Sequence, residues 1–239
     1  MITAHKSVDR YLSILAIGLL GLALAGCAAE PDRENLSLVK QQLRHYVTSG
    51  DYEREIAAVA QAAEHYLSAR VAGNTPGTSD RLAIVLDIDD TALSTWPSLM
   101  ANDFGLIKNG GCTIPQGPCG WPAWQERGQA PAIESTRALA QLAQDLGLAV
   151  FFITGRHERF RDATAQNLRA AGYDGWRGLV LQPADEHQPS ATDYKGPARQ
   201  KLEQEGYVIV LNMGDQESDL AGGHAERTFK LPNPFYLIP

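Results

Sequence analysis

The sequence is poor in the residues that build zinc sites. It has three cysteines and six histidines among 239 residues, and the histidines are scattered without ligand spacing. Cys112 and Cys119 have no histidine near them, whereas a structural zinc site normally has four ligands. A metal site built on these two cysteines is therefore disfavoured.

Basic residues are in the minority. Lysine and arginine number 21 against 28 aspartates and glutamates, the formal net charge is -7, and no basic cluster stands out. Surfaces that bind nucleic acid are usually basic, so we expect no nucleic-acid partner. A small anionic substrate stays open, because a local site can oppose the overall charge.

The N-terminal apolar run is short for a permanent membrane span. Residues 11–26 read YLSILAIGLLGLALAG, which is rich in glycine and alanine, and Lys6 and Arg10 precede the run. A basic segment followed by a short apolar one is the layout of a secretory signal, so residues 1–26 are interpreted as a signal peptide. A generic signal peptide and a short anchor helix are the alternatives.

The end of this run resembles a bacterial lipobox. In LAGC at 24–27, Cys27 would be lipidated and become the first residue of the mature protein. Ala28, rather than aspartate, follows it, which by resemblance to lipoproteins of Gram-negative bacteria indicates the outer membrane. We therefore expect a lipid-anchored protein of the bacterial cell envelope, with residues 27–36 as a tether.

In an exported protein two nearby cysteines usually pair, so we also expect a disulfide between Cys112 and Cys119.

Apolar runs alternate with helical patterns over the predicted domain, 37–239. Helical spacing covers about 38–46, 52–66, 133–146, 158–171 and 195–205, and apolar runs that predict strands cover 82–87, 148–154, 178–182, 207–213 and a last segment near 227–232. This order predicts an α/β fold, a parallel sheet flanked by helices on both faces, with additional N-terminal helices. Residues 95–130 are irregular and are predicted to form an insertion.

Polar residues gather at the predicted strand ends, where open α/β sheets bind ligands. DIDDT follows the first strand, TGR the second and GDQESD the fourth, while Lys195 is placed at a helix start. Crowded carboxylates at the rim of a sheet need a cation, and an all-oxygen site suits Mg²⁺. Asp87 and Asp215 are candidate ligands, with Asp219 completing the shell.

The same residues supply the parts of a phosphoryl-transfer site. Asp87 and Asp89, two apart, would face the same side, one as nucleophile and one as proton carrier. Thr154 and the backbone amide of Gly155 would hold phosphoryl oxygens, with Lys195 as a fixed positive charge. This set predicts hydrolysis of a phosphomonoester through an aspartyl-phosphate.

The order of these motifs resembles the haloacid dehalogenase (HAD) superfamily of phosphatases. Stretches such as ITGR, GDQ.SDL and TFKLPNPFY are similar to its subfamily IIIB, which holds plant acid phosphatases, vegetative storage proteins and bacterial lipoprotein acid phosphatases. The resemblance implies a Rossmann-like core with a small cap, Mg²⁺ dependence and an acidic pH optimum. It also implies Asp87 as nucleophile, Asp89 as general acid, and metal ligation by Asp87, the Asp89 carbonyl and Asp215.

Two positions depart from the family pattern. Asp90 stands where this branch often has glutamate, and Ser98 and Leu99 follow Pro97 where a substrate-stacking tyrosine is common. The second difference leaves nucleotide specificity open.

Several other residues carry two interpretations. Trp96, Trp121 and Trp124 are expected in the core, with a stacking platform for an aromatic leaving group as the alternative. Arg156 could hold a substrate anion. Arg199, four residues after Lys195, is expected in a surface ion pair, with orientation of a site carboxylate as the alternative.

Two main functions compete on this sequence, and a HAD phosphotransferase or mutase is a third, less favoured one. The first is an exported acid phosphatase that acts on small phosphomonoesters. The alternative is a non-catalytic surface lipoprotein of the same fold that binds or stores, as vegetative storage proteins do in this branch. The presence of Asp87 with its partners favours catalysis, and a homodimer stays open.

Overall fold

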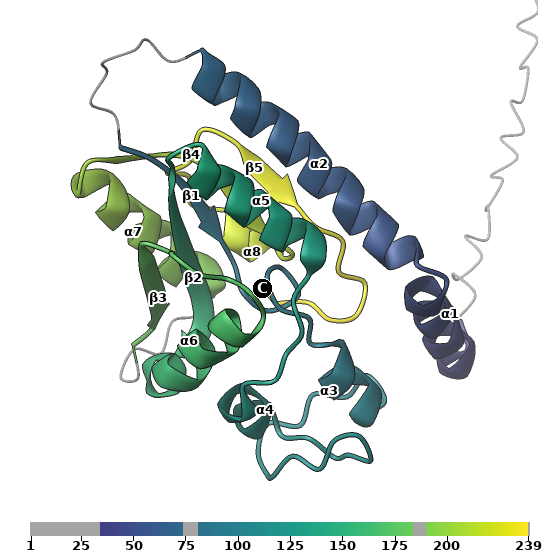
Figure 1. Cartoon of the computed structure of the whole chain (residues 1–239). Coiled ribbons are helices and arrows are strands. Elements are labelled where there is room, and N and C mark those ends of the chain that lie inside the picture. The colour runs from purple at the N-terminus through teal and green to yellow at the C-terminus, as the bar shows by residue number, and fades with distance from the viewer. Residues whose placement is uncertain (1–33, 74–80, 184–189, 239) are drawn as a thin grey trace, which may run out of the picture. The chain divides into compact units, whose positions relative to one another are not determined.

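Five parallel strands form the centre of the fold. The computed structural model describes residues 34–73, 81–183 and 190–238. Its strands are β1 (Arg81–Leu86), β2 (Ala149–His157), β3 (Gly178–Gln182), β4 (Tyr207–Gly214) and β5 (Thr228–Lys230). They pair in the order β3-β2-β1-β4-β5, and every pair is parallel (Figure 1). The predicted α/β class and the predicted short last strand are confirmed.

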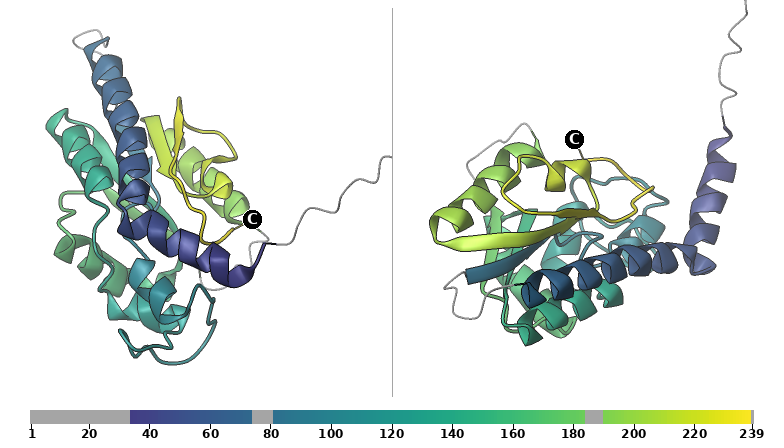
Figure 2. Two further views of the ribbon diagram at one scale, coloured as in Figure 1. Left: turned by 90° about the vertical axis from the view of Figure 1, so that its right-hand side faces the viewer. Right: turned by 90° about the horizontal axis from the view of Figure 1, so that it is seen from above.

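Helices cover both faces of the sheet. The helices outside the insertion are α1 (Leu36–Thr48), α2 (Asp51–Ala72), α5 (Glu134–Asp145), α6 (Arg161–Ala170), α7 (Ala191–Gln204) and α8 (Glu217–Leu220), with a 3₁₀ turn at Glu158–Phe160, and α1 packs on α2 rather than on the sheet. The alternation of side chains along β1 shows why both faces are apolar. Ile84 and Leu86 pack in one core with α2 and α5, whereas Val85 packs in another with α7 (Figure 2).

The insertion after β1 lies beyond the carboxyl ends of the strands. It carries the short helices α3 (Trp96–Ala101) and α4 (Trp121–Arg127), which lie below the sheet in Figure 1. The bridge between Leu93 and Ala132, with a hydrogen bond from the Ser94 amide to the Pro131 carbonyl at 2.8 Å, closes the base of the loop. This arrangement puts residues 95–130 over the edge where the polar motifs end.

Three predicted boundaries were wrong. α1 begins at Leu36, so the last residue of the predicted tether is helical. β2 continues to His157, because it pairs with β3 through an irregular register, and TGR therefore lies within the strand. α7 begins at Ala191 with Ser190 as its cap, where the Ser190 hydroxyl accepts from the Asp193 amide, so Lys195 lies inside the helix rather than at its start.

The predicted signal peptide and Cys27 lie outside the described residues. Within the described ranges, no helix has both the length and the apolar character needed to cross a bilayer.

The predicted disulfide is confirmed, because Cys112 and Cys119 are bonded, with 3.8 Å between their Cα atoms. The bond closes a loop in the insertion, and we expect it to stabilise that region by about 2–3 kcal/mol through the entropy of the unfolded chain. Thiol titration of the denatured protein without reductant should find neither cysteine free. A Cys112→Ser/Cys119→Ser variant should lose that stability in denaturant unfolding, whereas two titratable thiols in the unreduced protein would refute the pairing.

Candidate active site

The candidate site is a cavity at the carboxyl ends of the strands. Its volume is about 420 Å³, and it is lined by residues from the strand ends, the insertion, α7 and the C-terminal segment. Asp87 comes directly after β1, Asp215 directly after β4, and Asp219 lies in α8. The Asp87 amide donates to the Met213 carbonyl at 3.0 Å, which ties the end of β1 to β4.

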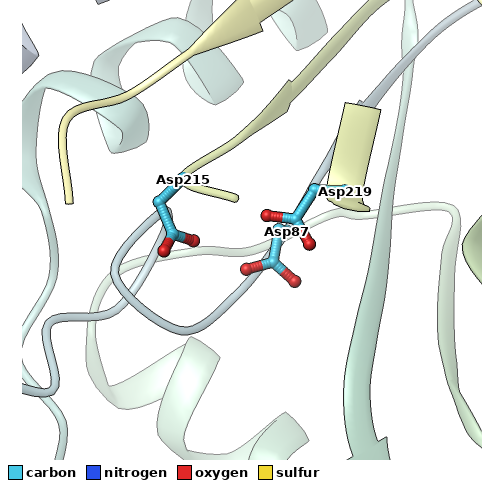
Figure 3. A group of neighbouring side chains, drawn as sticks. All are labelled: Asp87, Asp215 and Asp219. Carbon is cyan, nitrogen blue, oxygen red and sulfur yellow. The ribbon is translucent and has the colours of Figure 1, made fainter. Parts of the chain in front are cut away.

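Three aspartates meet at the floor of this cavity. Asp87, Asp215 and Asp219 are 7%, 2% and 4% exposed, and each offers a carboxylate oxygen within 4.8 Å of the others (Figure 3). Burial raises the pKa of Asp87 well above its ordinary value, and Asp219 and Asp215 raise it further although Lys195 opposes them. Burial and Asp219 likewise raise the pKa of Asp215 to about 6. A divalent cation would compensate this charge, and oxygen donors alone suit a hard metal ion.

Lys195 is the basic side chain among these acids. Its ammonium group, 4% exposed as a residue, donates to Asp87 and, at 2.6 Å, to Asp219. Burial alone would lower the pKa of Lys195, but the two carboxylates raise it overall, so the group is held as a cation. Its position inside α7 fixes this charge next to Asp87.

Asp89 does not join the three aspartates but pairs with Arg156. The guanidinium donates to Asp89 through Nε at 3.0 Å and through Nη2 at 2.7 Å, and Nη1 donates to the Thr164 hydroxyl at 3.3 Å. Arg156 is 1% exposed. Its donors are therefore directed at Asp89 and Thr164, and the contact with a substrate anion stays a prediction. A bidentate arginine fixes both oxygens of a carboxylate, so the geometry favours Arg156 as the residue that orients Asp89.

This geometry predicts how Arg156 variants fail. Arg156→Lys keeps the charge but loses the planar fork, so Asp89 should be misplaced while the rest of the site stays intact. For an alkyl phosphate, whose leaving oxygen needs a proton, we expect kcat to fall by about tenfold or more, and less for p-nitrophenyl phosphate. Arg156→Met should lose more. A rise in KM of equal size for both esters, with kcat unchanged, would instead assign Arg156 to substrate binding.

Thr154 and Gly155 line the same cavity from β2. Thr154 is 1% exposed, and its hydroxyl accepts from the Arg156 amide at 3.2 Å. Gly155 is exposed, and nothing lies within 4 Å of the position that a Cβ would take. The two residues are placed where a phosphoryl group beside Asp87 could be contacted.

The side chains that support Asp215 were not predicted from the sequence. Asn233 donates to Asp215 at 2.7 Å, Gln216 at 2.6 Å, and the Thr91 hydroxyl at 3.0 Å. The Lys230 ammonium group donates to the backbone carbonyl of Asp215 at 2.9 Å. Asn233 and Lys230 lie in or after β5, whose parallel pairing with β4 brings the carboxyl ends of the two strands together. Both residues belong to the family-like stretch TFKLPNPFY, which was the available signal, although it gave them no role.

Asp90 is held by a second set of contacts that the sequence did not indicate. It accepts from the Thr95 amide at 2.8 Å, from the Thr95 hydroxyl, and from the Tyr236 hydroxyl at 2.8 Å. Burial, followed by the charge of Asp215, raises the pKa of Asp90 to about 7. These bonds connect the turn after β1 to the base of the insertion and to the C-terminal segment.

The predicted surface pair of Arg199 was wrong. Arg199 is 0% exposed and donates to the carbonyls of Asp219 at 2.7 Å, Gly223 at 2.8 Å and Ala221. It therefore holds the backbone around Asp219 in place. Helical spacing placed it correctly beside Lys195, but it could not show that the segment 219–223 folds over this face of α7.

The three tryptophans of the insertion occupy different places. Trp124 is 2% exposed and belongs to the core, as expected. Trp96 packs against Phe104 and Phe235, with ring centroids 6.0 and 5.4 Å away. Trp121 lines the cavity, so it is the tryptophan placed to contact a ligand.

Comparisons with known proteins show the family of this chain. A family model described as HAD superfamily, subfamily IIIB (acid phosphatase) matches residues 27–239. Acid phosphatase 1 of Solanum lycopersicum is 36% identical over 197 residues, 82% of this chain and 73% of the relative. Vegetative storage protein 1 of Arabidopsis thaliana is 30% identical over 197 residues, 82% of this chain and 68% of the relative. The solved class C acid phosphatase from Bacillus anthracis superimposes with a TM-score of 0.62 at 26% identity, over 84% of this chain and 86% of that one. The chain therefore belongs to subfamily IIIB of the HAD superfamily, the acid phosphatases.

Proposed function

We propose that this protein hydrolyses small phosphomonoesters through an aspartyl-phosphate on Asp87, with Mg²⁺ as its metal. The observation that carries the proposal is the arrangement at the cavity floor. Asp87 accepts a hydrogen bond from Lys195 and forms a cluster with Asp215 and Asp219. Asp89 lines the same cavity and is held by two hydrogen bonds from Arg156. Nucleophile, counter-charges and proton carrier are thus provided by separate residues.

In the first step a carboxylate oxygen of Asp87 attacks phosphorus. The bond from phosphorus to the ester oxygen breaks as the new bond to Asp87 forms, and Asp89 gives its proton to the departing alcohol oxygen. Lys195 and the Thr154 hydroxyl are assigned to the phosphoryl oxygens, whose charge is distributed during transfer. Arg156 holds Asp89 in the position from which it donates.

In the second step water hydrolyses the aspartyl-phosphate. Asp89, now ionised, takes a proton from the water, whose oxygen attacks phosphorus while the bond to Asp87 breaks. Phosphate leaves, and both aspartates regain their starting states. Asp89 thus serves as acid and then as base, so no further titrating side chain is needed.

The acids fit the metal that the family resemblance implies. Asp87, Asp215 and the Asp89 carbonyl would hold Mg²⁺, with Asp219 in support, and Asn233 and Gln216 orient Asp215. When bound, Mg²⁺ would neutralise charge on the phosphoryl group and favour the ionised form of Asp87.

The proposal is tested with a panel of phosphomonoesters at acidic pH. Protein treated with a chelator should be inactive, and Mg²⁺ should restore release of phosphate from p-nitrophenyl phosphate and from alkyl esters. The non-catalytic alternative predicts binding of esters without turnover. Failure to release phosphate from any ester with Mg²⁺ present would reject the phosphatase and favour that alternative, to which the storage-protein relative gives some support.

We also propose that Cys27 is lipidated and anchors the protein in the bacterial cell envelope, at the outer membrane. The support is the LAGC sequence after the short apolar run. A Cys27→Ser variant expressed in a Gram-negative host should lose incorporation of labelled palmitate and leave the membrane fraction or stay unprocessed. Equal labelling of variant and wild type would contradict the anchor.

A further inference from the structure

The cavity has a charged end and an apolar end. Its charged lining residues all belong to the site already described, at the strand ends, in α7 and in α8. The insertion and the C-terminal segment supply apolar side chains: Leu99, Leu106, Ile107, Trp121, Leu237 and Ile238. The cavity of about 420 Å³ falls within the ~300–1,000 Å³ typical of ligand pockets, so it has room beyond a phosphoryl group.

Apolar side chains at this end are unusually exposed. Leu106 is 67% exposed, Leu237 77% and Ile238 43%. Exposed apolar groups that gather beside a site mark a binding surface more often than isolated ones do. A ligand that reaches from the aspartates past these residues would remove them from water.

Backbone contacts hold both apolar walls in place. In the C-terminal segment the Ile238 amide donates to Gln216 at 3.0 Å, and the Ser218 hydroxyl donates to the Ile238 carbonyl at 2.8 Å. In the insertion the Trp121 amide donates to the Ile107 carbonyl at 2.7 Å. A wall fixed in this way binds with little loss of chain entropy.

The described lining offers no spare cation for a second anionic group. Its basic side chains are Lys195, which is bound to Asp87 and Asp219, and Arg156, which is bound to Asp89. Four aspartates line the cavity against these two bases. A carboxylate or second phosphate on the substrate would therefore lose water without gaining an ionic partner.

We propose that the cavity selects phosphomonoesters whose alcohol is an alkyl chain or an aromatic ring without a second negative charge, and that Leu106 and Leu237 contact that group. This inference rests on the proposed phosphatase function, whose phosphoryl site defines the charged end. The insertion and residues 237–238 would then determine specificity through the leaving group.

The test compares hexyl phosphate with 6-phosphonooxyhexanoate, which has the same chain length and a primary alcohol but ends in a carboxylate. We expect kcat/KM to favour hexyl phosphate by at least about tenfold, and to rise from ethyl to hexyl phosphate, because each methylene leaves water. Leu237→Lys should lower kcat/KM for hexyl phosphate and raise it for the carboxylate ester. Leu38→Lys, at a 57% exposed position on α1 that does not line the cavity, should change neither.

The outcomes separate this inference from the function on which it rests. Turnover of both esters with equal kcat/KM, or equal effects of the two lysine variants, would overturn the apolar subsite and leave the phosphatase standing. A preference for the carboxylate ester would overturn it too. No turnover of any ester, p-nitrophenyl phosphate included, would overturn both.

Discussion

Replacing Asp87 with asparagine is expected to abolish turnover of every phosphomonoester, whatever its leaving group. The amide has nearly the shape of the carboxylate and can still accept from Lys195, which Asp87 does in the native site. It is far too weak a nucleophile to attack phosphorus, so no covalent intermediate would form. Steady-state release of phosphate, measured with both p-nitrophenyl phosphate and an alkyl phosphate, checks this result.

Two controls make the Asp87→Asn result interpretable. Metal binding is measured separately by calorimetry, because Asp87 is also a candidate ligand and its loss could empty the site. Asp145→Asn makes the same chemical change at an exposed position on α5 and should leave the rate unchanged. If Asp87→Asn retains substantial turnover, the aspartyl-phosphate mechanism is wrong, and the aspartates are only a metal-binding cluster.

Asp89→Asn should impair catalysis in a different way, because Asp89 is assigned the role of general acid and not that of nucleophile. The nucleophile and the backbone carbonyl of residue 89 remain, so esters of acidic phenols, which leave without a proton, should still react. Alkyl phosphates need the proton, and their rate should fall by about 10²–10⁴ or more. The ratio of kcat for p-nitrophenyl phosphate to kcat for an alkyl phosphate should therefore rise steeply.

Because Arg156 donates two hydrogen bonds to Asp89, the Asp89→Asn variant needs a control for the loss of that contact. The amide of the Asp89→Asn variant has a single oxygen that can accept, so one of the two buried Arg156 donors that now bond to Asp89 would lose its acceptor. The thermal midpoint should be measured to show that the fold persists, and Arg156→Met gives the matching loss on the other side of the pair. If Asp89→Asn slows both esters by the same factor, Asp89 is not the general acid.

The fold and the charged end of the site could be predicted from the sequence for one physical reason. Apolar runs and amphipathic helices alternate, and parallel strands bring their carboxyl ends to one edge. Asp87, Thr154 and Asp215 could therefore be placed together from the order of the motifs alone. The disulfide between Cys112 and Cys119 followed in the same way from local spacing in a chain expected to be exported.

The rest depends on contacts between segments that no local pattern encodes. The bidentate hydrogen bond from Arg156 to Asp89 joins residues that are 67 apart in sequence, and the hydrogen bond from Tyr236 to Asp90 joins residues that are 146 apart. Arg199 was expected at the surface, because a helical pattern cannot show which loop covers it. The C-terminal stretch TFKLPNPFY resembles the family, but the sequence assigned it no role at the cavity, and the pairing of β5 with β4 is what brings Asn233 to Asp215.

The most direct test of the central claim is the stereochemical course of phosphoryl transfer. A phosphorothioate monoester made chiral at phosphorus with two oxygen isotopes would be hydrolysed by the Mg²⁺-loaded protein in water that carries the third isotope, and the configuration of the released chiral thiophosphate determined. Attack by Asp87 followed by attack of water is two in-line displacements, so the account predicts overall retention. Inversion would mean that water attacks the ester directly, and it would contradict the aspartyl-phosphate on Asp87.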